Sequence, residues 1–164
     1  MRTSPVTDAE LAAQARAGSG EAFGALVERH AERARRVARA ALLDPHDADD
    51  AVQDALYSAW QALDRFDPAR PFGPWFVKIV VNAAADLRRR RKLRRTEEVP
   101  AGTPDTRAGP DRDTDRALLR EALDRALATL PDRRRMALVL HDAEGYVHEE
   151  IAAMLDVPVG TVRS

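Results

Sequence analysis

Apolar residues recur at steps of three and four along the first half of the chain, which places them on one face of a helix. The spacing does not alternate as it would in a half-buried strand. We therefore expect three amphipathic helices. Their apolar faces comprise Phe23, Leu26, Val27, Ala31, Ala34, Val37, Ala38, Ala41 and Leu42; Val52, Ala55, Leu56, Ala59, Trp60 and Leu63; and Phe72, Trp75, Phe76, Ile79, Val80, Ala83 and Leu87.

Turn-forming residues separate these predicted helices. A shorter helix is expected over 8–17, ended by Gly18 and Gly20. The Asp-Pro-His-Asp stretch at 44–47 separates the first long helix from the second, and Asp-Pro-Ala-Arg-Pro at 67–71 separates the second from the third. Because the connections are short, we expect a compact helical bundle.

Residues 96–115 are expected to form a flexible linker. They contain three prolines and two glycines and have no apolar period. Helical patterns lie on both sides, over 1–95 and over 116–164. The expected fold is therefore all-α, with two small helical domains joined by this linker.

The second domain has the spacing of a helix-turn-helix. Apolar periodicity returns over 118–130, Pro131 suits the first turn of the next helix, and Gly145 ends that helix. A short helix over 149–155, a turn of three to four residues and a helix from Val159 follow. An ordinary helical hairpin is the alternative interpretation.

Composition argues against a chemical catalyst. The chain has no cysteine, which excludes disulfides, thiolate metal sites and a cysteine nucleophile. The stretch 148–152 begins like a zinc-protease motif but lacks its second histidine, and 44–54 lacks the spacing of a calcium loop. No glycine-rich phosphate loop or local Ser/His/Asp motif is present. We expect a protein that is not an enzyme and holds no cofactor and no metal.

Hydropathy predicts a cytoplasmic protein without membrane insertion. No apolar run approaches the ~18–20 residues that a membrane-spanning helix needs. Residues 1–13 have one arginine, two acids and no apolar stretch, so they do not form a secretory signal.

Charge is segregated along the chain, although the formal net charge is only −1. Residues 40–64 contain six acids and no lysine or arginine, whereas residues 65–95 contain ten bases and two acids. This asymmetry favours two different partners on adjacent surfaces.

The most basic segment favours nucleic acid as one partner. Residues 88–95 contain seven bases in eight residues, and so much like charge is costly unless a polyanion neutralises it. A solvated helix end is the alternative, since bases suit a helix C-terminus. Trp75 could stack on an unpaired base and Asn82 could bind a base edge. Core packing is the better interpretation for at least two of Phe72, Trp75 and Phe76.

The acidic segment favours a basic protein partner. Asp47, Asp50 and Asp54 are spaced by three and four residues, so they share one side of a helix. A dense acidic face of this kind is complementary to a basic helix. For any single aspartate, a solubilising role or a helix N-cap is the stronger alternative.

In chain order, these features resemble the extracytoplasmic-function (ECF) group of the bacterial sigma-70 family. The resemblance covers roughly residues 8–164. Its most specific stretches are Asp-Ala-Asp-Asp-Ala-Val-Gln-Asp-Ala-Leu-Tyr-Ser-Ala-Trp at 47–60; Phe-Asp-Pro-Ala-Arg-Pro-Phe-Gly-Pro-Trp-Phe-Val-Lys-Ile-Val-Val-Asn at 66–82; and Leu-Ala-Thr-Leu-Pro at 127–131 with Glu144-Gly145 and Pro-Val-Gly-Thr-Val-Arg-Ser at 158–164.

The resemblance implies that 47–60 is region 2.2, which binds the clamp helices of the largest RNA polymerase subunit. The matching positions are Asp47, Asp49, Asp50, Gln53, Asp54, Leu56 and Trp60. It also implies that 66–92 forms regions 2.3 and 2.4, which recognise and melt the −10 element, with 67–71 cradling a flipped base. The matching positions are Asp67, Ala69, Arg70, Trp75, Lys78, Asn82, Arg88 and Arg89.

Residues 116–164 would be region 4, which binds the −35 element and the polymerase flap. Thr161, Arg163 and Ser164 match the opening of its recognition helix. Family members continue well past this point, so −35 binding by the sequence as given is expected to be crippled, while the first domain is expected to be complete. The resemblance also implies an inhibitory anti-sigma protein as a partner.

Two positions depart from the family pattern. Val147 stands where Ser or Thr commonly caps the first region 4 helix, and losing that cap costs ~1 kcal/mol unless another residue replaces it. Asp156 stands where Gly is common, and Asp tolerates a left-handed turn better than most residues.

Two other function classes stay open on sequence alone. A conventional helix-turn-helix regulator would bind duplex operators without polymerase, and it would have no use for the 47–60 segment. A helical adaptor would bind only proteins, which the bases at 88–95 argue against.

Overall fold

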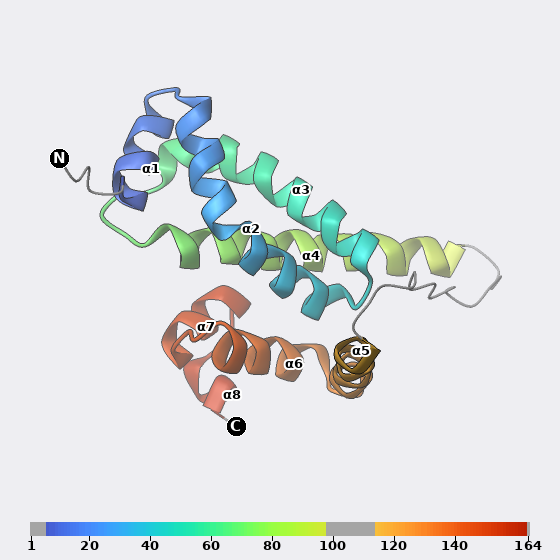
Figure 1. Cartoon of the computed structure of the whole chain (residues 1–164). Helices are drawn as coiled ribbons and strands as arrows, with labels where there is room; N and C mark the ends of the chain where they lie inside the picture. Colours follow the sequence, from blue (N-terminus) through green and yellow to red (C-terminus); the bar gives the residue numbers. More distant parts are fainter. Residues whose placement is uncertain (1–5, 98–113, 164) are drawn as a thin grey trace.

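The computed structural model describes residues 6–97 and 114–163, and all regular elements in those ranges are helical, as expected (Figure 1). A turn of π-helix follows α6 directly. In chain order the elements are α1 (Asp8–Arg16), α2 (Gly20–Leu42), α3 (Pro45–Ala62), the 3₁₀ turn η1 (Leu63–Arg65), α4 (Phe72–Glu97), α5 (Thr114–Ala128), α6 (Asp132–Leu138), the π turn η2 (Val139–Ala143), α7 (His148–Leu155) and α8 (Val159–Arg163).

Side-chain caps fix where the first three helices begin. Thr7, Ser19 and Asp44 each accept a hydrogen bond from the backbone N–H three residues further on. At the first of these, the carboxylate of Glu10 accepts the N–H of Thr7 in return. Gly18 has a φ of +102°, a conformation that ends α1 and that residues with a Cβ rarely adopt.

Three long helices, α2, α3 and α4, pack against one another along the first domain. Leu26, Phe72 and Phe76 are the largest side chains of these helices that are almost fully buried, and Val37, Val77 and Val80 are buried with them. Many of the other buried positions are alanine, whose small side chain allows close approach of two helices. The buried alanines of these helices are Ala22, Ala34, Ala38, Ala40, Ala41, Ala48, Ala51, Ala55, Ala59 and Ala84.

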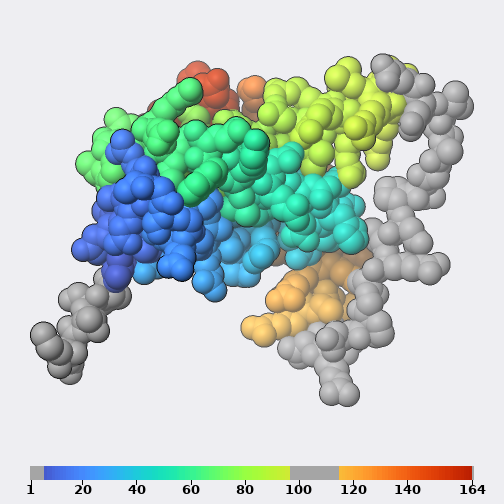
Figure 2. Space-filling model, turned by 90° about the horizontal axis from the view of Figure 1, so that it is seen from above, coloured from blue at the N-terminus to red at the C-terminus, as the bar shows by residue number. Residues whose placement is uncertain are grey.

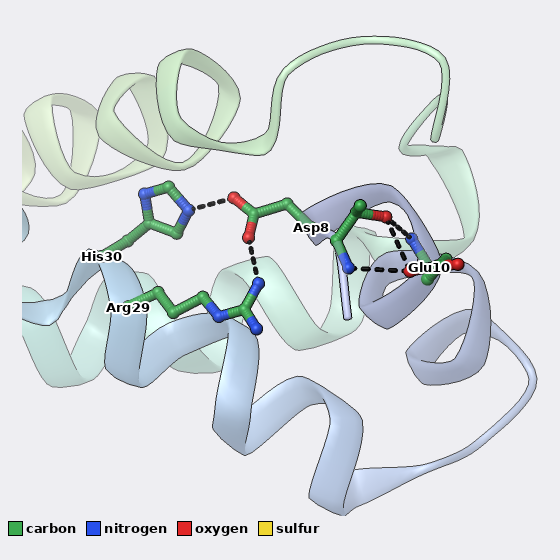
Figure 3. A network of polar contacts seen from close by, with 5 residues as sticks. Asp8, Glu10, Arg29 and His30 are labelled. Atoms are coloured by element: carbon green, nitrogen blue, oxygen red, sulfur yellow. Dashed lines mark hydrogen bonds and ion pairs between the residues drawn. The ribbon is translucent and has the colours of Figure 1, made fainter. Parts of the chain in front are cut away.

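A carboxylate from α1 fastens that helix to α2 (Figure 3). One Asp8 oxygen lies 2.7 Å from Nε2 of His30, and the other accepts from Nη1 of Arg29 at 2.9 Å. The His30 ring lies against Phe72, with centroids 5.3 Å apart. It also lies so close to Gly73 that a Cβ there would be 3.2 Å from the ring. This network therefore connects the start of α4 to α1 through α2.

The second domain packs on the first (Figure 1), so the two predicted domains share one apolar core within the described residues. Helices α6 and α7 lie against α2 and α4 respectively. In contrast, α5 projects at the edge of the molecule (Figure 2), and Leu118, Leu119 and Leu123 are each more than half exposed.

The observed ends differ slightly from the predicted ones. Helix α4 continues through the basic segment to Glu97 and α5 begins at Thr114, so both extend into the predicted linker. The rest of that linker, 98–113, lies outside the described residues. Pro131 is at the N-cap of α6 rather than in its first turn.

The two positions that depart from the family pattern, Val147 and Asp156, are both accommodated by the local structure. The side chain of Val147 cannot cap α7, but Glu150 accepts the N–H of Val147 at 3.1 Å and satisfies one otherwise orphaned donor. Asp156 adopts the left-handed conformation, with a φ of 53°, at the end of α7.

We expect Asp8→Asn to destabilise the protein at neutral pH by about 1 kcal/mol or less, because the pair with Arg29 is partly exposed to solvent. Burial alone would raise the pKa of Asp8, but His30 and Arg29 outweigh it and hold that pKa below 3.8. The stabilisation is therefore present above pH 3.8 and is lost as the pH falls through the lowered pKa.

Thermal unfolding of both proteins between neutral and acid pH checks this. The Glu32→Gln variant is the control, because that exposed carboxylate pairs only within α2. A destabilisation by Asp8→Asn that persists undiminished in strong acid would contradict the role of the Asp8 charge.

Candidate polymerase and DNA interfaces

One side of α3 exposes a row of acidic and polar side chains, which we call the acidic face: Asp49, Asp50, Gln53, Asp54, Tyr57 and Trp60. Tyr57 is 66% exposed and Trp60 is 42% exposed, although Trp60 also packs edge-on against Phe23. The opposite side of α3 is buried against α2 and α4. This amphipathic division leaves the whole acidic face available to a partner.

Two of the positions predicted to bind polymerase differ from the others. Leu56 is half-buried against the core. The side chain of Asp47 is only 6% exposed and forms an ion pair with Arg91 of α4. Burial raises the pKa of Asp47, Arg91 opposes that shift, and the negative charges of Asp44 and Asp50 add to it. Asp47 therefore joins the start of α3 to α4 and offers little surface to a partner.

Much of the predicted charge separation is neutralised inside the fold. Arg90 donates to Asp54 at 2.9 Å, and Arg91 pairs with Asp47, so the bases of α4 lie beside the acids of α3. Arg89 pairs with Asp86 of its own helix. The two exposed pairs, Arg90 with Asp54 and Arg89 with Asp86, are worth little, so a charged partner can replace them at low cost.

A groove of about 520 Å³ lies where the 67–71 loop meets α4. The loop is held in a tight turn because Asp67 accepts hydrogen bonds from the N–H groups of Ala69, at 3.0 Å, and Arg70, at 2.9 Å. The groove is lined in the first domain by Arg65, Phe66, Asp67, Arg70, Pro71, Pro74, Trp75 and Lys78, and in α7 by Glu150, Ala153 and Met154.

The aromatic residues at the start of α4 lie partly in the core and partly at the groove. Phe72 and Phe76 are buried, which confirms that at least two of the three aromatic residues in this stretch are core residues. Trp75 is only partly buried and lies 4.8 Å from Phe66 between ring centroids. It is thus held by its neighbours while one part of its ring faces the groove.

The α4 surface next to the groove carries the other predicted DNA-binding residues. Lys78 and Asn82 are exposed and one turn apart, so the fold places the 67–71 loop and Asn82 on the same side. Arg89 is exposed two turns further along. Arg88 instead pairs with Asp132 of α6, so its guanidinium faces the second domain.

The predicted −35 contacts lie at the end of the described chain. Thr161 and Arg163 belong to α8, and Arg163 donates to Glu149 of α7 at 2.8 Å. Ser164 lies outside the described residues, so its role in −35 binding stays a prediction.

The histidines do not assemble a chemical site. The rings of His141 and His148 stack with centroids 4.8 Å apart, and His30 belongs to the α1–α2 network. Among residues 6–97 and 114–163, no cluster of three or more His, Asp or Glu side chains is positioned to hold a metal ion. In the same residues, no helix has the length and apolar character to span a bilayer.

The sequence interpretation missed the polar contacts between the two domains. Glu144, whose side chain is 1% exposed, accepts from Nε of Arg36 at 2.7 Å and from Nε of Arg33 at 3.0 Å. The hydrogen bond between Arg36 and Glu144 raises the pKa of Arg36. Arg135 is buried and donates to the carbonyls of Ala40, at 2.5 Å, and Ala41, at 3.3 Å, at the end of α2. No local motif signals contacts between residues about a hundred positions apart.

We expect Arg91→Gln to destabilise the fold by about 1–2 kcal/mol at neutral pH, because it leaves the Asp47 carboxylate buried without its cation. The pKa of Asp47 is already raised, so protonation favours the folded state and the loss should shrink as the pH falls. The double variant Asp47→Asn with Arg91→Gln should recover most of the stability. Denaturant unfolding at neutral and acid pH measures all three proteins, and an Arg91→Gln loss independent of pH would contradict this coupling.

Comparison with known proteins matches the two helical domains to two regions of one family. Residues 26–94 match the model of sigma-70 region 2, and residues 120–164 match that of sigma-70 region 4. The chain is 35% identical to the RNA polymerase sigma factor CnrH of Cupriavidus metallidurans, over 94% of this chain and 86% of CnrH. It is 39% identical to the ECF RNA polymerase sigma factor SigM of Mycobacterium tuberculosis, over 96% of this chain and 78% of SigM.

Among solved structures, CnrH in complex with the cytosolic domain of CnrY matches with a TM-score of 0.70 and 35% identity, over 95% of this chain and 87% of that one. The sequence matches span both helical domains and their spacing. The chain therefore belongs to the sigma-70 family, in its ECF group of RNA polymerase sigma factors.

Proposed function

We propose that the acidic face of α3 binds the clamp helices of the largest RNA polymerase subunit while the groove and the exposed side of α4 bind the −10 element and open it. The observation that carries this is the fixed relation of the two surfaces. Both belong to α2–α4 and share one core, so polymerase bound to one surface holds the DNA against the other.

The groove has the chemistry needed to hold an unpaired base. Trp75 offers an aromatic surface for stacking, and Arg70 and Lys78 supply cations for the phosphates on either side. Flipping a base costs a few kcal/mol, and the chain has no fuel of its own. Contacts in the groove and attachment to polymerase must together offset that cost.

The second domain would supply the −35 contacts through α8, with Thr161 and Arg163 at the start of the recognition helix and Ser164 next in the chain. Region 4 would also contact the polymerase flap. Two weak DNA sites on one chain reinforce each other, because binding at the first raises the effective concentration of the second.

We further propose that an anti-sigma protein inhibits this chain. The matching structure of CnrH is a complex with the cytosolic domain of CnrY, which supports a partner of that kind here. The alternative of a conventional regulator acting without polymerase is not favoured, because the chain belongs to the ECF sigma group.

Charge reversal at Asp50 and Asp54 should weaken binding to core polymerase at least tenfold, because two attractive contacts become repulsive. Binding is measured by titrating the labelled protein with core polymerase. The Glu28→Lys, Glu32→Lys variant is the matched control, because it makes the same charge change on the exposed side of α2. Unchanged affinity for the α3 variant would remove the acidic face from the proposal.

Asn82→Ala should reduce opening of the −10 region more than it reduces binding to the closed duplex, because a base edge becomes accessible only when the strands separate. A promoter is first selected from a genomic library by run-off transcription with core polymerase. Fluorescence of 2-aminopurine in the −10 element then reports opening, and a gel shift reports duplex binding.

The matched control for Asn82→Ala is Gln14→Ala, which removes an exposed amide from α1 that does not line the groove. Equal loss of opening and duplex binding in the Asn82 variant would rule out base recognition by this residue. A library that yields no initiation dependent on core polymerase would reject the function as a whole.

A further inference from the structure

A single carboxylate from the second domain engages two arginines of α2. Glu144 is one of only three polar residues buried in the described chain, and it faces Arg33 and Arg36. The two arginine side chains are 37% and 53% exposed, so they lie at the rim of the contact, with Glu144 enclosed between them and its own domain. The Arg33 guanidinium also lies over the Tyr146 ring, 5.4 Å from its centroid.

These arginines are close to the −10 groove. A Cβ at Gly73, the second residue of α4, would lie 3.5 Å from Nη1 of Arg33, and the 67–71 loop ends just before α4 begins. Arg36 is one turn further along the same face of α2. Arg33 thus lies beside the start of α4, the helix that supplies Pro74, Trp75 and Lys78 to the groove.

The same packing of the second domain also covers one wall of the groove. Glu150, Ala153 and Met154 of α7 line it opposite the side chains of α4, and Met154 is buried. A carboxylate, Glu150, thus faces a groove whose other charged side chains are mostly cationic. Both carboxylates of the second domain thus lie beside cationic side chains of the first domain.

We propose that Arg33 and Arg36 form a binding site for a backbone phosphate of single-stranded DNA and that Glu144 competes for that site within the chain. The proposal rests on the proposed function of the groove. Two planar guanidinium groups on one helix face suit the oxygens of a phosphate as well as those of a carboxylate. Because one pair of arginines cannot bind both anions, the closed packing of the two domains and DNA binding exclude each other.

Glu144 belongs to the same chain as the two arginines, so its effective concentration at them is higher than that of DNA in solution. Binding of the second domain elsewhere, for example on polymerase, would remove Glu144 and expose both arginines together with the groove. The contact would then keep the isolated protein from binding single strands until such a partner is present.

Tighter DNA binding after the domains separate has two explanations: Glu144 no longer competes for the arginines, or the second domain no longer covers the groove. Two variants that both break the contact between Glu144 and the arginines distinguish these explanations. The variant Glu144→Gln removes the competitor and keeps the cations, whereas Arg33→Gln with Arg36→Gln removes the proposed phosphate site. The intact chain is titrated with a short fluorescent oligonucleotide of mixed sequence, without polymerase, and anisotropy is followed at several salt concentrations. Glu32→Gln and Arg35→Gln are the controls, because those exposed side chains pair with each other on α2.

Glu144→Gln should bind the oligonucleotide severalfold more tightly than the unmodified protein. The plot of log K against log salt concentration should be steeper by about 0.7, since the arginine pair adds one phosphate contact and each such contact with a single strand contributes about that much. The double arginine variant also uncovers the groove, so it should bind less tightly than Glu144→Gln and without the steeper salt dependence, and the two controls should change affinity only slightly. Equal tightening by Glu144→Gln and by the double arginine variant would overturn the phosphate site, because covering alone would explain it.

A variant that separates the two domains without changing Glu144 controls for other effects of substituting that buried residue. Arg135→Gln removes hydrogen bonds to the carbonyls of Ala40 and Ala41 and leaves both Glu144 and the arginine pair intact. It should also tighten binding, by less than Glu144→Gln. Unchanged DNA affinity in both opening variants, with circular dichroism showing native helix content, would overturn the proposal.

Affinity for core polymerase, measured on the same proteins, distinguishes this failure from failure of the proposed function. Normal polymerase binding without tighter DNA binding rejects only the competition by Glu144. Failure of the unmodified protein to bind core polymerase would reject the proposed function.

Discussion

Close packing of α2, α3 and α4 through small side chains is the constraint on which both proposed surfaces depend. Each alanine buries little area, at roughly 0.8 kcal/mol per methyl-sized group, but the many buried alanines allow the three helices to lie close together. Phe72 then packs against Phe76 in the core and against Trp75, which lines the groove. A bulkier residue in the alanine contacts would separate the helices and move the acidic face relative to the groove.

Electrostatic contacts within the chain prepare these surfaces for charged partners. Arg90 lies against Asp54, Arg88 against Asp132, and Arg33 and Arg36 against Glu144. The same cations are candidates for DNA phosphates, and Asp54 is a candidate for polymerase contact. For the exposed pairs, Arg90 with Asp54 and Arg88 with Asp132, exchanging an internal partner for an external one changes the free energy only modestly. In the isolated protein these internal pairs also reduce the field that either surface presents to solvent.

Apolar periodicity was sufficient to predict α2, α3 and α4, because each has one buried face, whereas the periodic leucines of α5 are exposed. Gly18 and the Asp-Pro pairs at 44–45 and 67–68 punctuate the first domain where the structure shows breaks. Two of the three aspartates that spacing places on one side of α3, Asp50 and Asp54, are exposed, and the 67–71 loop followed from its prolines. These features are local, so a single sequence records them.

Contacts between distant segments were not predictable in the same way. Asp47 shares its spacing with Asp50 and Asp54, yet it is buried because α4 continues far enough for Arg91 to cover it. Glu144 and its arginines are 108 and 111 positions apart, with no motif to connect them. Charge segregation suggested separate partners, whereas folding brings several of the opposite charges together. Long-range pairing depends on how the helices pack, which composition and periodicity do not specify.

The central claim, that one rigid helical unit holds polymerase on α3 and an open DNA strand on α4, is tested most directly by site-specific photocrosslinking. A photoreactive residue is placed at Tyr57 on the acidic face or at Lys78 beside the groove, and each protein is mixed with core polymerase and a promoter carrying an unpaired −10 region. The account predicts that position 57 crosslinks to the largest polymerase subunit and position 78 to the non-template strand. Crosslinks from position 57 to DNA, or none to DNA from position 78 while polymerase is bound, would contradict it.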